Sequence, residues 1–245
     1  AVSKVKVPLT TNPRFQKEAA EIALQMSQFS VDELERLLRV NAKIAVENYK
    51  RYQAFHAEAT PELPALLAYT GIVFKRLNPK DFSAEDFGYA QEHLRLTSFC
   101  YGLLRPLDVI RAYRLEGDVV LPELGNQTLF SYWRSRLTDT FIEDIRSAGG
   151  ILCNLASDEM KSLFDWKRVE SEVRVVTPEF HVWKNGKLAT IVVYTKMSRG
   201  EMTRFILKNK IGNPEELKGF SWEGFEFDES LSDERKLVFI NGMGE

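Results

Sequence analysis

The sequence predicts an α+β protein: a single compact domain in which a mixed β-sheet is surrounded by helices. Helical and strand-like patterns follow one another without the regular alternation of a doubly wound fold. Asn185-Gly186, flanked by β-branched and aromatic residues, is the strongest hairpin pattern in the chain. The 245 residues are 44% hydrophobic and 28% charged with both signs mixed, as in folded soluble proteins. Because no repeat or linker interrupts the pattern, we expect residues 1–245 to form one domain.

Apolar residues at helical spacing predict three helices in the first part of the chain. The first covers about 15–26 and the third about 42–56. Between them, Ser30 and Glu33 match a capping box, which starts the second helix. The apolar run 65–69 is more typical of a strand than of a helix.

Helices and strands alternate in the rest of the chain. Ser83 caps a helix, and any helix must end before Pro106, because the residue before a proline disfavours helical angles. Ser198 and Glu201 match a second capping box, which opens a helix just after a strand ending near Lys196. We also expect strands at 119–121, 151–155, 173–176, 180–183, 188–195 and 237–240, a long helix at about 128–145 and a short one after Asn213.

Most familiar catalytic and metal-binding motifs are absent from the sequence. It has no phosphate-binding glycine loop, no dinucleotide fingerprint, no nucleophile elbow and no paired zinc ligands around its three histidines. Cys100 and Cys153 lie in apolar segments, so we expect reduced core residues and a cytoplasmic location. No stretch is apolar enough to cross a membrane. We therefore expect no metal, no cofactor and no membrane partner.

Basic and acidic residues are unevenly distributed, although the net charge is only −2. A nearly neutral total does not by itself suggest a nucleic-acid-binding protein. Residues 184–210, however, carry seven lysines and arginines against one glutamate, and 95–114 carry four arginines against one aspartate. Residues 215–245 carry nine acidic residues against three basic ones. The two basic segments suit an anionic partner, and the acidic tail suits a cover over one of them.

The turn 154–159 (Asn-Leu-Ala-Ser-Asp-Glu) is the first candidate site. It follows a buried strand, and polar groups after the carboxyl end of a strand often line a site. Asp158 and Glu159 are the candidate catalytic residues, as an acid and base or as metal ligands. The structural alternative is that Ser157 or Asp158 caps the next helix while Glu159 complements its dipole.

The second candidate site is the expected helix start near residue 198. Helix N-termini attract anions, so Lys196, Arg199 and Arg204 would meet the same negative group there. Cations are unfavourable in the first turn of a helix unless such a partner is bound. The alternative is a solvated basic face that pairs with the acidic tail.

The third candidate site is the basic segment 95–114. Gly102 would let backbone N–H groups approach a phosphate, and Arg105 would clamp it. The candidate phosphate-binding residues of this segment are Arg95, Tyr101, Gly102, Arg105 and Arg114. The alternative is a structural turn in which Arg105 pairs with Asp108.

Several pieces of the sequence together carry a family resemblance, and their order is kept over nearly the whole chain. They are 101–108 (YGLLRPLD), 113–116 (YRLE), 130–133 (FSYW), 154–159 (NLASDE), 199–206 (RGEMTRFI) and the Gly-Phe pairs at 219 and 224. In these pieces the chain resembles the YaaA family of bacterial peroxide-stress proteins. Family members open with a short apolar strand followed by Ser-Pro-Ala-Lys. This chain starts later, in the segment leading to Pro8, so we expect that strand to be missing and any site that needs its lysine to be incomplete.

The resemblance implies a compact α+β fold with a positively charged cleft and a helix-hairpin-helix element that binds DNA. In this chain 94–104 would be the second half of that element, with 99–102 near its hairpin. Hairpin N–H groups would hold one phosphate while arginines neutralise its neighbours, which positions a protein without reading sequence. The resemblance also implies survival of hydrogen peroxide through limitation of free iron.

The expected function is therefore that of a monomeric protein of the peroxide response that binds double-stranded DNA. The alternative is an enzyme that acts on a nucleotide or another phosphorylated small molecule in the same basic cleft, with Asp158 and Glu159 near Lys196 and Arg199. A third hypothesis is a binding module without chemistry, in which the acidic tail covers the basic face.

Overall fold

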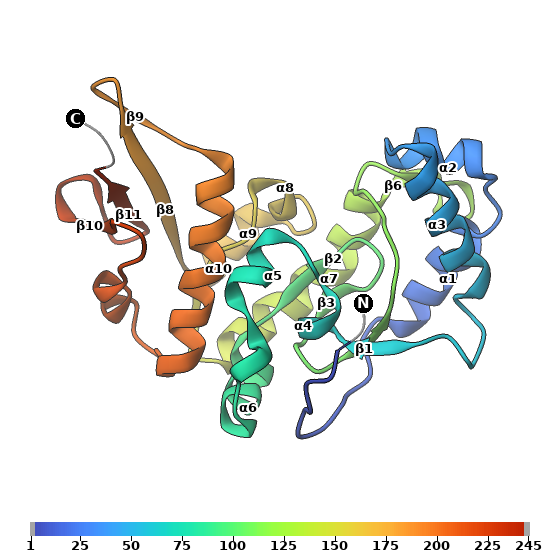
Figure 1. Ribbon diagram of the computed structural model, residues 1–245, viewed down its shortest axis with the longest axis horizontal. Helices are drawn as coiled ribbons and strands as arrows, with labels where there is room; N and C mark the ends of the chain where they lie inside the picture. The colour runs from blue at the N-terminus through green and yellow to red at the C-terminus, as the bar shows by residue number, and fades with distance from the viewer. Residues whose placement is uncertain (1–2, 243–245) are drawn as a thin grey trace. The chain divides into compact units, whose positions relative to one another are not determined.

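A computed structural model describes residues 3–242 of the chain (Figure 1). These residues divide into two compact units. Unit 1 comprises the residues up to 68 together with 94–141 and 158–166, and unit 2 comprises 69–93, 142–157 and the residues from 167 onward. Helices and strands are both abundant, which confirms the α+β class. That residues 1–245 form a single domain stays a prediction.

Unit 1 begins with the three expected helices, α1 (Gln16–Met26), α2 (Val31–Leu38) and α3 (Ala42–Ala54). The Ser30 side chain accepts a hydrogen bond from the backbone N–H of Glu33, and the Glu33 carboxylate accepts one from the backbone N–H of Ser30. The predicted capping box is therefore present, and it satisfies two N–H groups that a helix start otherwise leaves without partners.

The apolar run 65–69 is helical, which corrects the strand prediction. It contains the short helix α4 (Ala65–Ala68), which directly follows β1 (Glu62–Pro64). β1 pairs antiparallel with β4 (Val109–Arg111). Alanine and leucine are strong helix formers and a proline favours the helix start, so the chain turns into a helix as soon as β1 ends.

Residues 96–104 form a tight β-hairpin. β2 (Leu96–Ser98) and β3 (Gly102–Leu104) pair antiparallel. Gly102 has φ of 68°, and a Cβ added there would lie 2.7 Å from the ring of Trp133, so only glycine fits. The expected helix-hairpin-helix element is not confirmed, because this segment is extended rather than helical.

The next elements along the chain agree with the expected strand at 119–121 and the long helix at about 128–145. They are β5 (Val120–Leu121), η2 (Pro122–Leu124), β6 (Gln127–Thr128), α7 (Leu129–Ser147), α8 (Asp158–Lys161) and α9 (Trp166–Glu172).

Unit 2 is built on a five-stranded mixed sheet, which confirms the predicted sheet type. Its strands are β7 (Ile151–Cys153), β8 (Arg174–Lys184), β9 (Lys187–Ala189), β10 (Phe225–Asp228) and β11 (Lys236–Asn241). The order is β10-β11-β8-β7, with β9 paired to β8. β8 runs parallel to β7 and β11 and antiparallel to β9. The two strands expected at 173–176 and 180–183 are one continuous strand.

The Asn-Gly turn joins β8 and β9 as predicted. Asn185 and Gly186 have φ of 52° and 71°, the left-handed values that a two-residue hairpin turn of this kind requires. The turn sets the register in which Trp183 lies opposite Leu188 and Lys184 opposite Lys187.

One face of this sheet carries the core of unit 2, against which α10 (Val192–Asn209) packs. Along β8, Phe180 and Val182 are buried while His181 and Trp183 are more exposed, as the two-residue period of a strand requires. The core consists of Val176, Phe180, Val182, Met202, Leu217, Phe220, Phe225, Leu237 and Phe239.

Helix α10 begins at Val192, six residues before the predicted start at Ser198. The β-branched run 191–193 suggested a continuing strand, but β9 ends at Ala189. Helix formation buries Met202 and Leu207 on one side of α10, and this packing outweighs the weak β-propensity of the run.

The other helices of unit 2 precede the sheet strands in the sequence or connect them. They are α5 (Ile72–Leu77), η1 (Pro79–Asp81), α6 (Ala84–His93), η3 (Pro214–Gly219) and η4 (Glu229–Leu231). The backbone N–H of Asp86 donates to the Ser83 hydroxyl, which caps α6 as predicted. Among the described residues no helix is both long and apolar enough to cross a bilayer.

Candidate functional site

Tyr101 and Gly102, two predicted phosphate-binding residues, lie inside unit 1. The Tyr101 side chain is 3% exposed, and its hydroxyl accepts a hydrogen bond from the backbone N–H of Arg111. Gly102 is buried against Trp133. Their positions explain why the sequence has an aromatic residue and a glycine here: they close the β2–β3 hairpin over α7.

Arg105 is held by Asp108, as the structural alternative expected. The backbone N–H and the guanidinium of Arg105 both donate to the Asp108 carboxylate, at 2.8 and 2.9 Å. Asp108 is fully buried and also accepts a hydrogen bond from the Thr11 hydroxyl at 2.6 Å. The Arg105 guanidinium donates to the carbonyl of Asn12 as well. Arg105 therefore ties the turn to the N-terminal segment.

The other two candidate arginines of this segment, Arg95 and Arg114, are also engaged with nearby groups. The Arg114 guanidinium lies 3.2 Å from the Glu116 carboxylate. The backbone carbonyl of Arg114 accepts a hydrogen bond from the buried hydroxyl of Tyr52 at 2.5 Å. Arg95 donates to the carbonyl of Leu94.

Asp158 and Glu159 begin α8 and are exposed. Asp158 pairs with Lys161 one turn later at 2.8 Å, which is the arrangement expected of a solvated helix start. Both acids lie in the first turn, where the helix dipole favours them.

Glu116 is a functional candidate that the sequence argument missed. Burial raises the pKa of its carboxyl, the adjacent Arg114 opposes this, and the carboxylates of Glu159 and Asp118 raise it further. Glu116 was part of the matching piece 113–116, but its charge alone did not distinguish it from other exposed glutamates. Only the fold brings it within electrostatic reach of Glu159.

In unit 2, Lys196 and Arg199 lie inside α10 and not at its start, which corrects the predicted helix start; that they bind an anion stays a prediction. Because α10 begins at Val192, the N–H groups of residues 196–199 are already inside the helix. Lys196 is exposed and forms no ion pair with any described residue.

Gly200 brings α5 and α10 into close contact. A Cβ added to Gly200 would collide with the carbonyl oxygen of Val73 and would lie 2.7 Å from Cβ of Arg76. This close crossing places the basic residues of α5 and of the turn after it beside those of α10.

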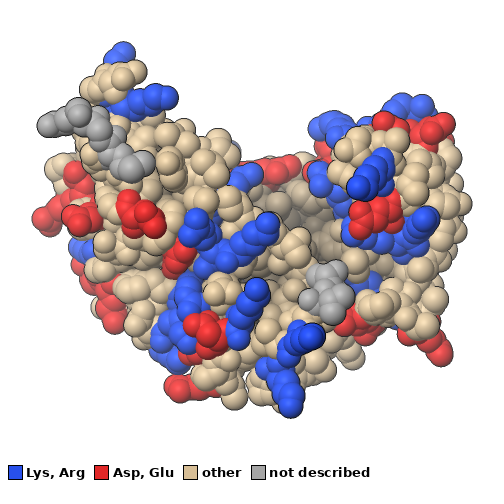
Figure 2. Space-filling view, viewed as in Figure 1, with Lys and Arg blue, Asp and Glu red and all other residues tan. Residues whose placement is uncertain are grey.

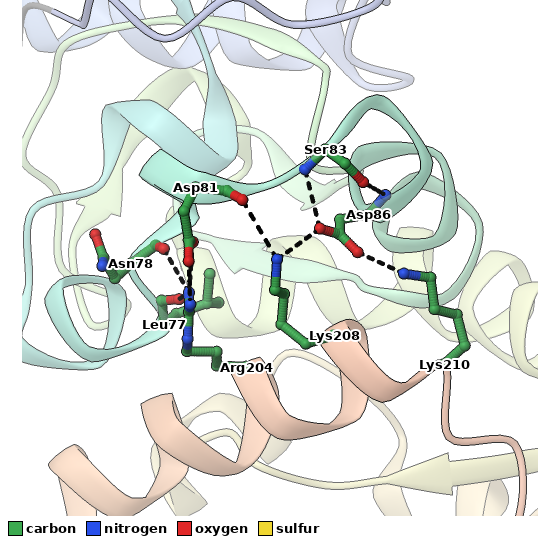
Figure 3. Close-up of polar contacts among 8 residues, drawn as sticks. All are labelled: Leu77, Asn78, Asp81, Ser83, Asp86, Arg204, Lys208 and Lys210. Carbon is green, nitrogen blue, oxygen red and sulfur yellow. Dashed lines mark hydrogen bonds and ion pairs between the residues drawn. The ribbon is translucent and has the colours of Figure 1, made fainter.

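Asp81 and Asp86 hold the C-terminal half of α10 against these elements (Figure 3). The Arg204 guanidinium binds both carboxylate oxygens of Asp81 and also donates to the carbonyl of Asn78 at 2.8 Å. Lys208 and Lys210 bind one carboxylate oxygen each of Asp86. These three cations therefore pair with residues 81 and 86, and not with the acidic tail as the alternative expected.

Asp86 is 3% exposed yet ionised. Burial by itself raises the pKa of its carboxyl, but hydrogen bonds from Lys208, Lys210 and Ser83 outweigh this and hold the pKa well below its usual range. A buried carboxylate with this many donors is a structural anchor, because its lone pairs are already occupied.

We call the surface of α5, η1 and α10 the basic face. Figure 2 shows lysines and arginines gathered over these helices, with a few acids among them. Its basic residues are Lys75, Arg76, Lys80, Lys196, Arg199, Arg204, Lys208 and Lys210. Lys75, Lys80 and Lys196 are exposed and form no ion pair with a described residue, so their charges face solvent.

The cysteines provide no nucleophile. Burial raises the pKa of Cys153 to about 12 and that of Cys100 still further, so neither is a thiolate at neutral pH. Within residues 3–242 no group of three or more His, Cys, Asp or Glu side chains is arranged to hold a metal ion.

The fold and the basic face define an α+β protein with a helical surface suited to anions. Among known protein families, the model of the peroxide stress protein YaaA family matches residues 2–231. The chain therefore belongs to the YaaA family of peroxide stress proteins.

Similar bacterial proteins cover the whole chain. A UPF0246 protein of Bacteroides thetaiotaomicron is 99% identical over 245 residues, which are all of this chain and 95% of that protein. A UPF0246 protein of Bacteroides fragilis is 78% identical over 244 residues, again all of this chain and 95% of that protein. A UPF0246 protein of Crocosphaera subtropica is 37% identical over 235 residues, 96% of this chain and 92% of that protein.

Proposed function

We propose that this protein acts in the cytoplasm during the response to hydrogen peroxide, that it binds double-stranded DNA through the basic face, and that it helps to limit free iron. The observation that carries the proposal is the set of three exposed lysines that form no ion pair with a described residue: Lys75 on α5, Lys80 on η1 and Lys196 on α10. The role in the peroxide response rests on the family.

The cations of the basic face that pair with carboxylates and those that face solvent have different roles. Arg204, Lys208 and Lys210 pair with the two carboxylates of Asp81 and Asp86, so most of their charge is compensated within the fold and they add less to an external field than unpaired lysines do. The three exposed lysines keep their charge and their three donors each. When such lysines contact DNA phosphates, the DNA releases its condensed counterions, and this release favours binding without any reading of the base sequence.

The chemistry of the two cysteines supports protection through DNA binding and not through reduction of peroxide by a thiol. A thiol must be an exposed thiolate to reduce peroxide. Cys100 is buried, and burial raises the pKa of both thiols. We therefore assign no scavenging role to them.

The test measures binding of a labelled 20-base-pair duplex at several salt concentrations. The triple variant Lys75→Gln, Lys80→Gln, Lys196→Gln should weaken binding at least about tenfold near 50 mM salt and lower the salt slope by nearly three, since each lost phosphate contact removes about 0.9. A matched control replaces Lys17, Lys43 and Lys50, three exposed lysines of unit 1, by glutamine. Equal weakening by both triple variants, or no binding by the wild-type protein at low salt, contradicts the proposal.

Survival of hydrogen peroxide and the level of chelatable iron are measured in cells that carry the same variants. The basic-face variant should lose protection while the control keeps it. Full protection by a variant that no longer binds DNA would separate the peroxide role from DNA.

A second candidate function is catalysis on a phosphorylated small molecule, favoured by the half-buried carboxyl of Glu116 near Glu159. A carboxyl with a raised pKa suits a general acid. Glu116→Gln should then abolish peroxide protection without changing duplex affinity or the circular dichroism spectrum. Unchanged protection rejects this function. The earlier candidates Asp158 and Glu159 stay predictions, with Asp158→Asn as the parallel variant.

A further inference from the structure

The hairpin formed by β8 and β9 exposes an aromatic side chain, that of Trp183. Trp183 is 42% exposed and Leu188, directly opposite on β9, is 38% exposed. Opposite residues share one face of a hairpin, so the two side chains form a flat apolar surface on the side away from the buried Val182. Trp183 contacts no other aromatic ring or cation among the described residues.

Two lysines flank this surface at the tip of the hairpin. Lys184 and Lys187 lie directly opposite each other, and neither forms an ion pair with a described residue. Like charges at directly opposite positions destabilise a hairpin. An anion bound between them would remove that repulsion.

The segment that contains the hairpin carries no negative charge of its own beyond Glu179. Residues 180–200 contain no aspartate or glutamate. The nearest acid on β8, Glu179, accepts a hydrogen bond from the His181 ring, whose other nitrogen contacts the Thr190 hydroxyl. The hairpin therefore combines an exposed indole with positive charge that no described residue neutralises through an ion pair.

We propose that the β8–β9 hairpin binds single-stranded DNA, with an unpaired base stacked on Trp183 and the adjoining phosphates held by Lys184 and Lys187. The proposal deepens the proposed function, because it names the DNA form that a second element of unit 2 recognises. Bases of any sequence offer a π-face, so aromatic stacking with flanking cations is how proteins hold single strands without sequence preference.

An anionic membrane is the other partner with negative charge and an apolar component, but the order of residues along the hairpin argues against it. Membrane-inserting loops place apolar residues at the tip. Here the tip is Lys184-Asn185-Gly186-Lys187, and Trp183 and Leu188 lie behind it. Insertion would bury both lysines before either apolar side chain, whereas a nucleotide lying across the hairpin contacts both pairs at once.

The test compares binding of a fluorescent 12-nucleotide oligothymidylate with binding of a duplex. Trp183→Ala should weaken single-strand binding at least about tenfold and leave duplex affinity within about twofold, since one stacked base accounts for a large share of such affinity. Trp183→Phe, which keeps an aromatic face, should recover most of the loss. Lys184→Gln with Lys187→Gln should lower the single-strand salt slope by about one.

Two controls match the hairpin variants. Leu231→Ala removes another side chain that is 38% exposed in unit 2, and Lys43→Gln with Lys50→Gln removes two exposed lysines of α3. Neither should change single-strand affinity. Thermal unfolding is measured for every variant. Because the replaced side chains are exposed, we expect no lowered midpoint, and Lys184→Gln with Lys187→Gln should unfold at a slightly higher temperature because it removes a like-charge repulsion.

The outcomes separate this inference from the proposed function. Wild-type binding of duplex with no effect of the hairpin variants on single strands overturns the inference and leaves the proposed function standing. Single-strand binding that depends on Trp183 without duplex binding supports the inference and rejects the proposed function. A loss confined to vesicles containing phosphatidylserine, with oligothymidylate binding intact, overturns the inference in favour of a membrane surface.

Discussion

Ser198 carries a hydroxyl that is fully buried and has no hydrogen-bond partner in the described structure. An unsatisfied buried hydroxyl costs about 1–3 kcal/mol. Ser198→Ala should therefore raise the free energy of unfolding by about 1 kcal/mol, as measured by urea denaturation. The control is Thr203→Val on the same helix, which removes a hydroxyl that donates to the Arg199 carbonyl at 2.7 Å and should lower stability. A loss of stability in the Ser198 variant shows that its hydroxyl has a partner after all.

Asp86 makes the stability of unit 2 depend on pH. Its carboxylate has a lowered pKa in the folded protein, so the stability that it contributes is complete above its unfolded pKa of about 3.9 and disappears as the pH falls through the folded value. Asp86→Asn should cost about 2 kcal/mol at pH 7, because hydrogen bonds to charged groups are lost. The difference from the wild-type protein should shrink between pH 4 and pH 2.

The measurement is denaturant unfolding at several pH values, with Glu85→Gln as the control. Glu85 is exposed and adjacent to Asp86 but forms no ion pair with a described residue. The Asp86 prediction fails when its difference from wild type is the same at pH 7 and at pH 2.

At the scale of residues, charge and spacing predicted Arg105 and Arg204 as phosphate ligands. In the structure both arginines form ion pairs with carboxylates. The Arg105–Asp108 pair spans three residues, so the sequence already contained it as an alternative. The Arg204–Asp81 pair spans 123 residues, and no local pattern reveals it.

The contact between α5 and α10 depends on one glycine. Gly200→Ala should lower the free energy of unfolding by about 2 kcal/mol or more, because the added methyl group collides with the backbone of α5 at Val73. Gly88, within α6, has open space around its Cα, so Gly88→Ala should instead stabilise the protein by about 0.5–1 kcal/mol. Thermal or urea unfolding of the two variants checks the opposite signs. A neutral Gly200 variant would mean that the two helices separate easily.

Among the secondary-structure elements, those with a local signal were predicted well. The capping boxes at α2 and α6 and the Asn-Gly turn between β8 and β9 are formed by residues close together in sequence. Predictions failed at α4, at the start of α10 and in the β2–β3 hairpin. At each of these places weak propensities compete, and packing against distant residues such as Trp133 decides the outcome.

On the scale of the whole chain, each unit is assembled from segments that are far apart in sequence. Residues 167–245 contain β8 and α10 but lack β7, which pairs with β8, and α5, which packs against α10. A fragment of residues 167–245 should therefore fail to unfold cooperatively by circular dichroism. Adding residues 69–157 should restore a cooperative transition. A cooperative fragment would show that the late strands and α10 fold without those partners.

At this scale the distribution of charge along the chain is more informative than the net charge. A net charge of −2 conceals the basic segment 184–210 and the acidic tail. One alternative from the sequence was that the two would face each other, but Arg204, Lys208 and Lys210 pair with carboxylates at 81 and 86. The tail instead contributes β10 and β11 to the sheet.

The sequence by itself determined the α+β class, the capped helices, the Asn-Gly hairpin, the charge segregation and the family, because each depends on residues within a few positions of one another or on motifs kept in order. Only the tertiary structure decided which cations are available to an anion. An arginine beside a buried carboxylate and a lysine facing solvent look alike in sequence, and they differ only in the distant groups that folding brings within about 3 Å of them.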